Sequence, residues 1–345
     1  MIKNQAVNIF LIILIFSGIF LRFYNLRFNT MFNWDQENLL AFPAKSILID
    51  HKFTLIGAPT GVGDLRIGPL YSYLAAAAFY FTGMDPIAGP ILSGTLAIFT
   101  AVIAVFLIKY IVSINTALHF AALWLLSPFI LTFDRTPWNV NLLPLASILV
   151  CLGLWMVYLD LQKYGWSVAG LGIFIGANSH FSSIFLVVVS IIVALDTRKK
   201  ISRYFLFLPL FFVIAIAPLA IFNLRHDNIL INNFSTFTYS SLISSGELFN
   251  TFLRSLSLNL ETLGRLILPN SQSLYQILLA SIMLGAIFIL NTEKKYKAYK
   301  RIMLFFLISY IIGFSLYKRH IPDYYILGLI PPFTLGLAQL LYKYF

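Results

Sequence analysis

The sequence predicts an all-α protein, a polytopic bundle of about ten transmembrane helices. Hydrophobic residues make up 59% of the 345 residues and charged residues 11%, whereas soluble domains average about 45–50% apolar and about 25% charged residues. Mean hydropathy is +0.85. The Lys and Arg residues behind the net charge of +11 stand in short blocks between apolar stretches, where basic residues set membrane topology. This placement argues against nucleic acid as a partner.

Ten apolar stretches are predicted to cross a hydrocarbon core of about 30 Å, although several are short. The first lacks a small-x-small cleavage site and is therefore predicted to stay as a transmembrane helix. Cys151 is the single cysteine, so we expect a core residue without a disulfide or a metal site. The predicted spans are residues 8–21, 87–108, 116–133, 139–160, 167–179, 181–195, 205–222, 273–290, 302–317 and 323–343.

The apolar segment from Pro69 to Phe81 is short, about 13 residues, and glycines bracket it, which favours a re-entrant or interfacial helix. If this segment does not cross, the basic clusters at 198–203 and 294–301 fall on the same side as Lys3. If it crossed, both clusters would lie outside, against the positive-inside rule. We therefore expect both termini to be cytoplasmic. The expected location is the plasma membrane.

This topology separates the acidic residues from the basic ones. It leaves only Asp160, Asp196 and Glu293 of the 13 acidic residues on the inner side. The two long non-spanning stretches, 22–86 and 224–270, both fall outside. We interpret residues 1–345 as one transmembrane domain whose active face is the extracytoplasmic one.

The first outer stretch contains the densest polar motif, Trp34-Asp35-Gln36-Glu37. Behind it, apolar residues from Leu39 to Leu48 are spaced as in an amphipathic helix lying in the membrane interface. A glycine-rich turn, 57–63, follows and leads to Asp64, Arg66 and Tyr71. Glycine lets the backbone bend close to a ligand or a neighbouring helix.

The order of these features resembles the GT-C superfamily of integral membrane glycosyltransferases, and more narrowly its protein O-mannosyltransferase and aminoarabinose-transferase-like branch. An acid follows the first span, an amphipathic outer segment comes next, and Gly68-Pro69-Leu70-Tyr71 opens a short helix. The resemblance extends over most of the chain through four further motifs: Asp134 to Asn141, Asn178-Ser179-His180-Phe181, Arg225-His226, and Lys318-Arg319-His320 with Asp323-Tyr324-Tyr325.

The resemblance implies transfer of a sugar, hexosyl or pentosyl, from a polyprenyl-phosphate donor to an acceptor hydroxyl, with inversion. Such a reaction needs a base for the acceptor proton, and Asp35 is the expected one. Fixed cations stabilise the leaving phosphate as its charge develops. The expected cations are Arg66, Arg135, Arg225 and Arg319.

Each of these residues also has a structural alternative. Asp35 could cap the amphipathic helix, Glu37 is expected to be a supporting or solvated acid, and Asp64 is either a supporting acid or a turn residue. Asp134 and Arg135 are expected as a second catalytic acid and a phosphate contact, or as an ion pair with each other.

The expected substrate-binding residues are aromatic, amide and imidazole side chains near the outer face. His180 could equally be a core residue, and Arg225, His226, Arg319 and His320 could be ordinary interface anchors. The full set is Trp34, Tyr71, Trp138, Asn139, His180, His226, His320 and Tyr324.

No metal site is predicted, because the acids form no tight cluster, yet a divalent cation shared by Asp35 and Asp134 stays open as a cofactor. The expected partners are the lipid-linked donor, membrane lipid and a glycan, lipid or protein acceptor. A transporter or a flippase is the alternative function, and it would place ionisable residues along the middle of the spans. An inactive membrane scaffold is a further alternative that would not explain why acids, arginines and histidines gather on one face.

Overall fold

The computed structural model describes residues 2–29, 37–60, 65–198, 202–241, 245–290 and 294–344. Within these ranges the chain forms helices and connecting loops, with a single isolated β-bridge between Pro59 and Arg66 and no strand. The all-α prediction is confirmed. The α-helices are α1 (Ile2–Phe23), α2 (Leu26–Asn29), α3 (Phe42–Leu48), α4 (Leu70–Phe81), α5 (Ala88–Ile111), α6 (Ile114–Leu126), α7 (Pro128–Asp134), α8 (Leu143–Tyr158), α9 (Gln162–Ala177), α10 (Ile184–Asp196), α11 (Phe207–Arg225), α12 (Ile229–Ser241), α13 (Leu248–Arg265), α14 (Ser273–Leu290), α15 (Lys294–Ser315) and α16 (Ile330–Tyr344).

A short 3₁₀ or π-helical turn precedes several of these helices. They are the π-helical turn η1 (Glu37–Ala41) and the 3₁₀ turns η2 (Asn139–Leu142), η3 (Phe181–Ser183), η5 (Arg203–Leu206), η6 (Ser245–Glu247) and η7 (Asp323–Leu329). Because η2, η3 and η7 run straight into α8, α10 and α16, three of the long helices begin with an irregular turn.

Nine of the ten predicted spans each fall on one helix or on a helix with its leading 3₁₀ turn, whereas 116–133 falls on two helices, α6 and α7, bent by 68°. Five helical segments in the described residues are long and apolar enough to cross a membrane by length and composition, and the bent pair α6 and α7 makes a sixth. The segments that contain α1, α9, α10 and α14 are shorter than this criterion requires or less apolar. The chain is therefore an integral membrane protein whose spans differ widely in length.

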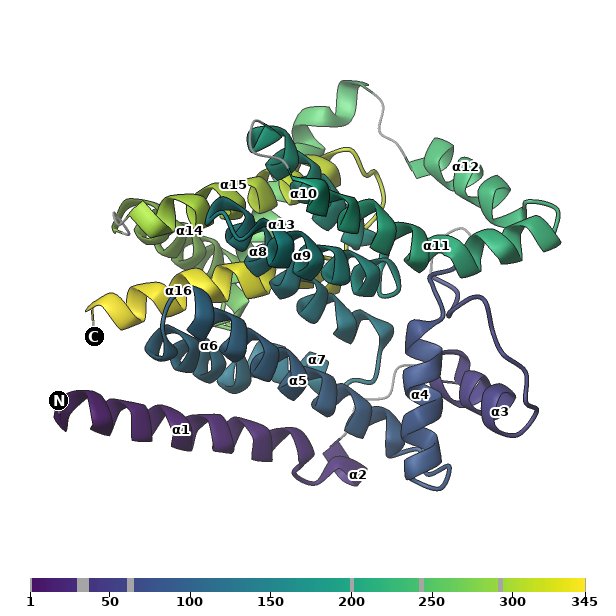
Figure 1. The fold of residues 1–345 in the computed structure, drawn as a ribbon, viewed down its shortest axis with the longest axis horizontal. Helices are drawn as coiled ribbons and strands as arrows, with labels where there is room; N and C mark the ends of the chain where they lie inside the picture. Colours follow the sequence, from purple (N-terminus) through teal and green to yellow (C-terminus); the bar gives the residue numbers. More distant parts are fainter. Residues whose placement is uncertain are drawn as a thin grey trace.

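The two ends of the bundle carry different parts of the chain. Both termini lie at one end, and the segments α2, α3 and α4 of the first predicted outer stretch lie at the other (Figure 1). Helix α4 runs across the direction of α5 instead of along it (Figure 1). The short helix predicted over 69–81 is present as α4, with 12 residues, and the prediction that it does not cross the membrane stays a prediction.

The amphipathic segment before α4 differs from its prediction in one detail. Leu39, Leu40 and Ala44 are buried as expected, but Phe42 is exposed, with 56% of its surface accessible. The helix starts with a π-turn, which shifts the phase of the apolar face and turns Phe42 away from the core.

Helix α8 is the centre of the bundle. Its sequence is apolar on every side, the pattern of a fully enclosed helix, and all of its spanning window is buried. It packs against α5, α9, α10, α15 and α16. Helix α11 is the opposite case, because only 11% of its spanning window is buried, so most of its apolar surface faces outward.

The contact between α8 and α9 depends on small residues. A Cβ added to Gly165 would lie 2.7 Å from the carbonyl oxygen of Gly153, and one added to Gly172 would lie 2.6 Å from that of Ala146. In a membrane, such close approach of two backbones replaces the hydrophobic driving force that water supplies elsewhere.

We expect Gly165→Ala to destabilise the protein by about 1–3 kcal/mol, because overpacking would push α9 away from the backbone of α8. Thermal unfolding in detergent would measure this. Gly285→Ala in α14 is the matched control, since no atom lies within 4 Å of an added Cβ there, and alanine improves helix propensity by up to about 1 kcal/mol. Equal effects of the two variants would contradict this account of the α8–α9 contact.

Candidate functional site

Part of the predicted site lies outside the described residues. This applies to Trp34, Asp35 and Asp64, whereas Glu37 is described only as the first backbone position of η1. Asp35 nevertheless stands two residues before η1, which leads directly into α3. The elements beside it are therefore known.

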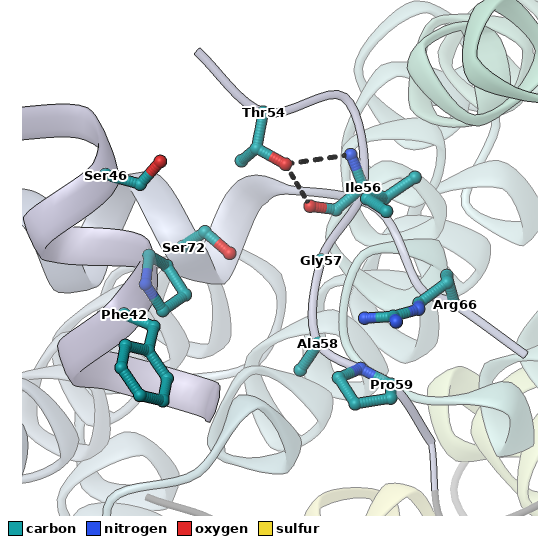
Figure 2. A pocket seen from close by; sticks show the side chains of 10 residues that line it. Phe42, Ser46, Thr54, Ile56, Gly57, Ala58, Pro59, Arg66 and Ser72 are labelled. Carbon is teal, nitrogen blue, oxygen red and sulfur yellow. Dashed lines mark hydrogen bonds between the residues drawn. The ribbon is translucent and has the colours of Figure 1, made fainter. Parts of the chain in front are cut away.

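A pocket of about 310 Å³ lies between α3, the start of α4 and the segment from Thr54 to Arg66. Arg66 reaches into it from one side and the hydroxyl of Ser72 faces it from the other (Figure 2). Arg66 is one of the four arginines predicted to bind phosphate. The other three, Arg135, Arg225 and Arg319, do not line this pocket. The lining residues are Phe42, Pro43, Ser46, Thr54, Ile56, Gly57, Ala58, Pro59, Arg66 and Ser72.

Arg66 is held in place by a short antiparallel pairing. The amide of Gly57 donates to the carbonyl oxygen of Ile67 at 2.7 Å, the amide of Thr60 donates to that of Leu65 at 2.8 Å, and Pro59 faces Arg66 in the bridge. Across the pocket, the Thr54 carbonyl accepts a hydrogen bond of 2.8 Å from the Tyr73 hydroxyl. The described residues 57–60 and 65–67 thus form a paired arm, and Thr54 just before it is anchored to α4.

Asn178 connects this arm to the transmembrane bundle. Its side-chain oxygen accepts from the amide of Leu70 at 3.3 Å, at the start of α4. Gly68 lies so close to Asn178 that a Cβ on Gly68 would overlap the amide oxygen. The Gly68-Pro69 motif therefore allows the pocket and the end of α9 to meet.

Four of the predicted substrate-binding residues come together at the starts of α8, α10 and α16. The Tyr324 ring lies 4.4 Å from that of Trp138 and 5.7 Å from that of His180. The side-chain nitrogen of Asn139 donates to the carbonyl oxygen of Ser179 at 2.5 Å. Tyr325, which was not predicted, lies 4.4 Å from His180. We call Trp138, Asn139, His180, Tyr324 and Tyr325 the aromatic cluster.

His180 is a buried, neutral member of this cluster. Its Nδ1 lies 2.9 Å from the Ser182 hydroxyl and accepts from the Ser182 amide, so the ring caps η3. Burial lowers the pKa of His180 to about 4. Its burial and low pKa fit the core-residue alternative. Its ring contacts Tyr324, which was predicted to bind substrate.

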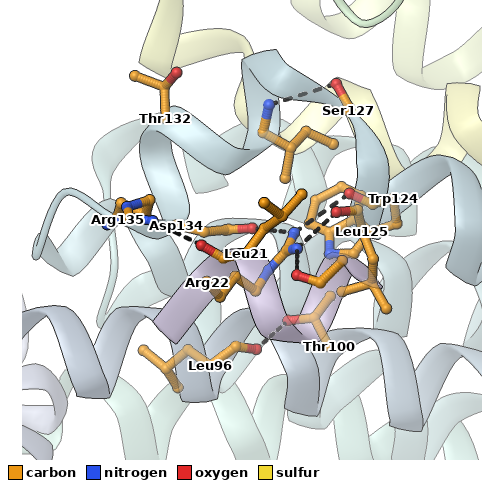
Figure 3. A network of polar contacts seen from close by, with 12 residues as sticks. Leu21, Arg22, Leu96, Thr100, Trp124, Leu125, Ser127, Thr132, Asp134 and Arg135 are labelled. Atoms are coloured by element: carbon orange, nitrogen blue, oxygen red, sulfur yellow. Dashed lines mark hydrogen bonds and ion pairs between the residues drawn. The ribbon is translucent and has the colours of Figure 1, made fainter. Parts of the chain in front are cut away.

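Asp134 and Arg135 do not pair with each other, contrary to one alternative. The Asp134 carboxylate lies 2.5 Å from Nη2 of Arg22, and this ion pair is buried. The guanidinium of Arg135 donates to the carbonyl oxygens of Leu21 and Tyr24, at 2.7 and 2.9 Å. Both residues at the end of α7 therefore bind the end of α1 (Figure 3).

Arg22 was not predicted as a site residue, although an arginine at the last turn of an apolar span is a visible signal. It is fully buried and also donates to the carbonyl oxygens of Gly18 and Leu125, at 2.8 and 2.7 Å. We call the contacts of Arg22, Asp134 and Arg135 with α1, α6 and α7 the clasp.

The remaining predicted residues lie apart from the pocket. Arg225 is exposed at the last position of α11, and the neighbouring His226 stacks on Phe222 with ring centroids 3.9 Å apart. Arg319 lies over the ring of Phe237, 5.7 Å from its centroid, and His320 is exposed. Tyr71 is buried in α4, with 2% of its surface accessible. Within the ranges that the structure describes, no three His, Cys, Asp or Glu residues form a metal-binding group.

Removing one partner of the clasp should be costly. We expect Asp134→Ala to destabilise the protein by about 3–5 kcal/mol, because it leaves the buried Arg22 charge without its counterion. Thermal unfolding in detergent would measure the loss. Asp85→Ala is the control, since its partner Arg27 is 62% exposed and such surface pairs stabilise by about 0–1 kcal/mol. Similar losses in both variants would contradict the role of the clasp.

The low pKa of His180 predicts a pH-dependent stability. An unfolded chain binds a proton at His180 near pH 6.5, whereas the folded protein resists protonation until about pH 4. Stability is thus complete above pH 6.5 and should fall by about 3 kcal/mol as the pH drops to 4. His180→Phe should flatten this part of the unfolding profile, and His320→Phe, at an exposed position, should leave it unchanged. An unaltered profile in His180→Phe would refute the assignment.

No protein-family model matches the sequence, and no curated protein matches it either. Among the solved structures that resemble the fold are two of one protein. ArnT from Cupriavidus metallidurans bound to undecaprenyl phosphate aligns with a TM-score of 0.67 and 13% identity, over 95% of this chain and 60% of ArnT. The same ArnT in the apo state gives 0.65 and 12%, over 96% and 60%.

The chain thus spans about 60% of the length of the ArnT structures it matches. At this level of identity the likeness concerns the fold, and it runs through nearly the whole of the present chain. The predicted resemblance to GT-C membrane glycosyltransferases is confirmed as a resemblance of fold.

Proposed function

We propose that this protein is a membrane glycosyltransferase that moves a sugar from a polyprenyl-phosphate donor to an acceptor hydroxyl. The observation that carries the proposal is the likeness to ArnT holding undecaprenyl phosphate, over 95% of this chain. The pocket at Arg66 supports it, because that pocket lies in the first predicted outer stretch, where the sequence motifs gather.

Arg66 is the proposed contact for the donor phosphate. The lipid phosphate gains negative charge as the sugar–phosphate bond breaks, and a guanidinium held beside it stabilises that charge. The hydroxyls of Ser46 and Ser72 line the same pocket and are suited to hydrogen bonds with phosphate or sugar oxygens, whereas the Thr54 hydroxyl already donates to the carbonyl oxygen of Ile56. Arg225 and Arg319 are exposed and stay secondary candidates.

Asp35 is the proposed general base, with Glu37 and Asp64 as supporting acids. It takes the proton of the acceptor hydroxyl while the acceptor oxygen bonds to the anomeric carbon and the bond from that carbon to the phosphate oxygen breaks. One displacement of this kind inverts the anomeric carbon. The position of Asp35 in the sequence supports this role. It stands two residues before η1, which runs into α3, and α3 contributes Phe42, Pro43 and Ser46 to the pocket.

Asp134 and Arg135 receive a different proposed role from the one expected. Since Asp134 pairs with Arg22 and Arg135 holds two carbonyl groups of α1, we assign both to positioning instead of catalysis. Their contacts fix the end of α1, and the segment that contains Asp35 follows α1 in the sequence. The aromatic cluster, with its tilted and edge-to-face rings, is the proposed surface for a sugar or an acceptor.

The distribution of buried charge favours an enzyme over a transporter or flippase. Among the described residues, Arg22 and Asp134 are the only buried members of the Lys, Arg, Asp and Glu classes. They form one pair at the end of α1, whereas a translocation pathway would place such groups along the middle of the spans. We propose that the end with Arg66 is extracytoplasmic and that both termini are cytoplasmic.

The test is an assay of purified protein with a panel of radiolabelled polyprenyl-phosphate sugars and cell-envelope acceptors, reading the release of free polyprenyl phosphate. Arg66→Ala should lower turnover about 10²–10³-fold and Asp35→Asn about 10²–10⁴-fold. Lys52→Ala is the control, because Lys52 is exposed in the same outer stretch and lines no part of the pocket.

Two outcomes would contradict the roles assigned to Asp35 and Arg66. Release that persists unchanged in Asp35→Asn would remove the base, and equal losses in Arg66→Ala and Lys52→Ala would remove the phosphate contact. Failure of every donor in the panel with wild-type protein would overturn the proposed reaction itself.

A further inference from the structure

Helix α13 lies across the bundle instead of along it. Near its start, the guanidinium of Arg254 donates to the carbonyl oxygen of Lys318, at 3.1 Å, and to that of Tyr317. At its end, Arg265 pairs with Asp323. Arg254 and Arg265 are separated by a rise of about 16 Å, yet both bind the short connection between α15 and η7. A helix that crossed the bundle would have its ends at opposite faces, so α13 runs transversely at the end with the aromatic cluster.

The residues of α13 are sorted by polarity around the helix. It has 18 residues but is not among the described helices that are apolar enough to cross a membrane. One side carries its charges, and a second side is polar and buried. The spacing of each set follows the helical period. The charged row is Arg254, Glu261 and Arg265, and the buried polar row is Thr251, Ser255, Asn259 and Thr262.

The buried polar row faces the bundle. The Ser255 hydroxyl donates to the carbonyl oxygen of Ile311 in α15 at 2.8 Å, and the side-chain nitrogen of Asn259 donates to the carbonyl oxygen of Ser255 at 2.8 Å. Near the end of the helix, Gly264 lies so close to Gln276 in α14 that an added Cβ would overlap its backbone. Protein therefore covers the polar row, and the remaining side of α13 points away from α14 and α15.

That remaining side is apolar and exposed. Phe249 is 70% exposed and Leu253 is 46% exposed, and two leucines continue the same side at helical spacing. We call Phe249, Leu253, Leu256 and Leu260 the apolar row. Exposed apolar patches of this kind mark contacts with a membrane or a protein. An apolar row beside a charged row, on a helix that does not cross, is the pattern of a helix lying in a membrane interface.

We propose that α13 lies in the membrane interface, with the apolar row among the acyl chains of a phospholipid bilayer and the charged row at the depth of the headgroups. Such helices bury their apolar face about 5–10 Å into the boundary between headgroups and acyl chains. Since Arg265 holds Asp323, which precedes Tyr324, this contact fixes the start of η7, and with it the aromatic cluster, relative to the membrane surface. The contact is independent of the proposed reaction.

Depth-dependent fluorescence quenching of the full-length protein in dioleoyl-phosphatidylcholine vesicles would test this proposal. Phe249→Cys, Leu253→Cys and Leu260→Cys are each labelled with NBD, and wild-type protein, whose Cys151 is buried, gives the background labelling. The vesicles contain lipids with a nitroxide either just below the headgroup or near the chain end. The shallow nitroxide should quench all three labels at least about twofold more strongly than the deep one, because the whole helix lies at one depth.

Exposed positions on α14 and α13 provide the matched controls. Leu274 and Ile282 in α14 are 61% and 68% exposed and differ by a rise of about 12 Å. Because α14 is predicted to cross, Leu274→Cys should prefer the shallow nitroxide and Ile282→Cys the deep one. Asn250→Cys is exposed but lies outside the apolar row, so aqueous iodide should quench its label at least about threefold more than that of Phe249→Cys.

A depth that increases steadily from Phe249→Cys to Leu260→Cys would overturn the proposal, because α13 would then cross the membrane. Equal iodide quenching of Phe249→Cys and Asn250→Cys would overturn it by placing the apolar row in water. A Phe249→Cys label that neither lipid nor iodide quenches would overturn it in favour of a protein cover, and concentration-dependent pyrene excimers at this position would identify a second copy. If Leu260→Cys does not fold, the two more exposed positions, Phe249 and Leu253, decide the test.

Discussion

At the end of the bundle with the Arg66 pocket, the structure depends on a buried arginine. It donates hydrogen bonds to carbonyl groups that a break between two helices leaves without helical partners. Helix α6 stops at Leu126, and α7 starts at Pro128 with a bend of 68° between them. Pro128 has no N–H to give to the carbonyl of Trp124, four residues earlier, and the extended Ser127 carries the chain away from the helical path. An unpaired carbonyl is expensive in a membrane protein. Arg22 donates to Leu125 and, at 3.4 Å, to Trp124, so α1 supplies the donors that the proline removes.

The same break organises the neighbouring elements. The Ser127 hydroxyl accepts from the amide of Ile130 as the cap of α7 and donates to the carbonyl of Leu266, just past the end of α13. One residue earlier, Arg265 pairs with Asp323 at 3.0 Å, at the start of η7. The clasp, α13 and the aromatic cluster therefore form one connected framework. Asn178 connects the Arg66 pocket to α9, which ends next to His180. A change in the clasp should thus be felt on both sides of the proposed site.

Sequence reasoning found the features that depend on local composition and missed those that depend on helix packing. The apolar run from Pro69 to Phe81 was enough to predict the short helix α4, and the predicted topology put Trp138, His180 and Tyr324 on one face, where they lie in contact. The partner of Asp134 was out of reach, because Arg22 lies 112 residues away in the chain and meets it only where α1 approaches α7. Adjacency in sequence suggested instead that Asp134 would pair with Arg135. At the end of a helix these two side chains point in different directions, toward the core and toward the carbonyl groups of α1.

Three irregular turns meet at the aromatic cluster. Trp138, His180 and Pro322 each stand in extended conformation before a 3₁₀ turn, at η2, η3 and η7. Contacts of Tyr324 with Trp138 and His180 join the three turns. The 3₁₀ turn η5 also follows an extended residue, Ser202, but it packs against α9 and α11. The proposed reaction needs a base, a cation and hydroxyls, and the three joined turns are connected through Asn178 to the pocket that supplies the Arg66 guanidinium and the hydroxyl of Ser72.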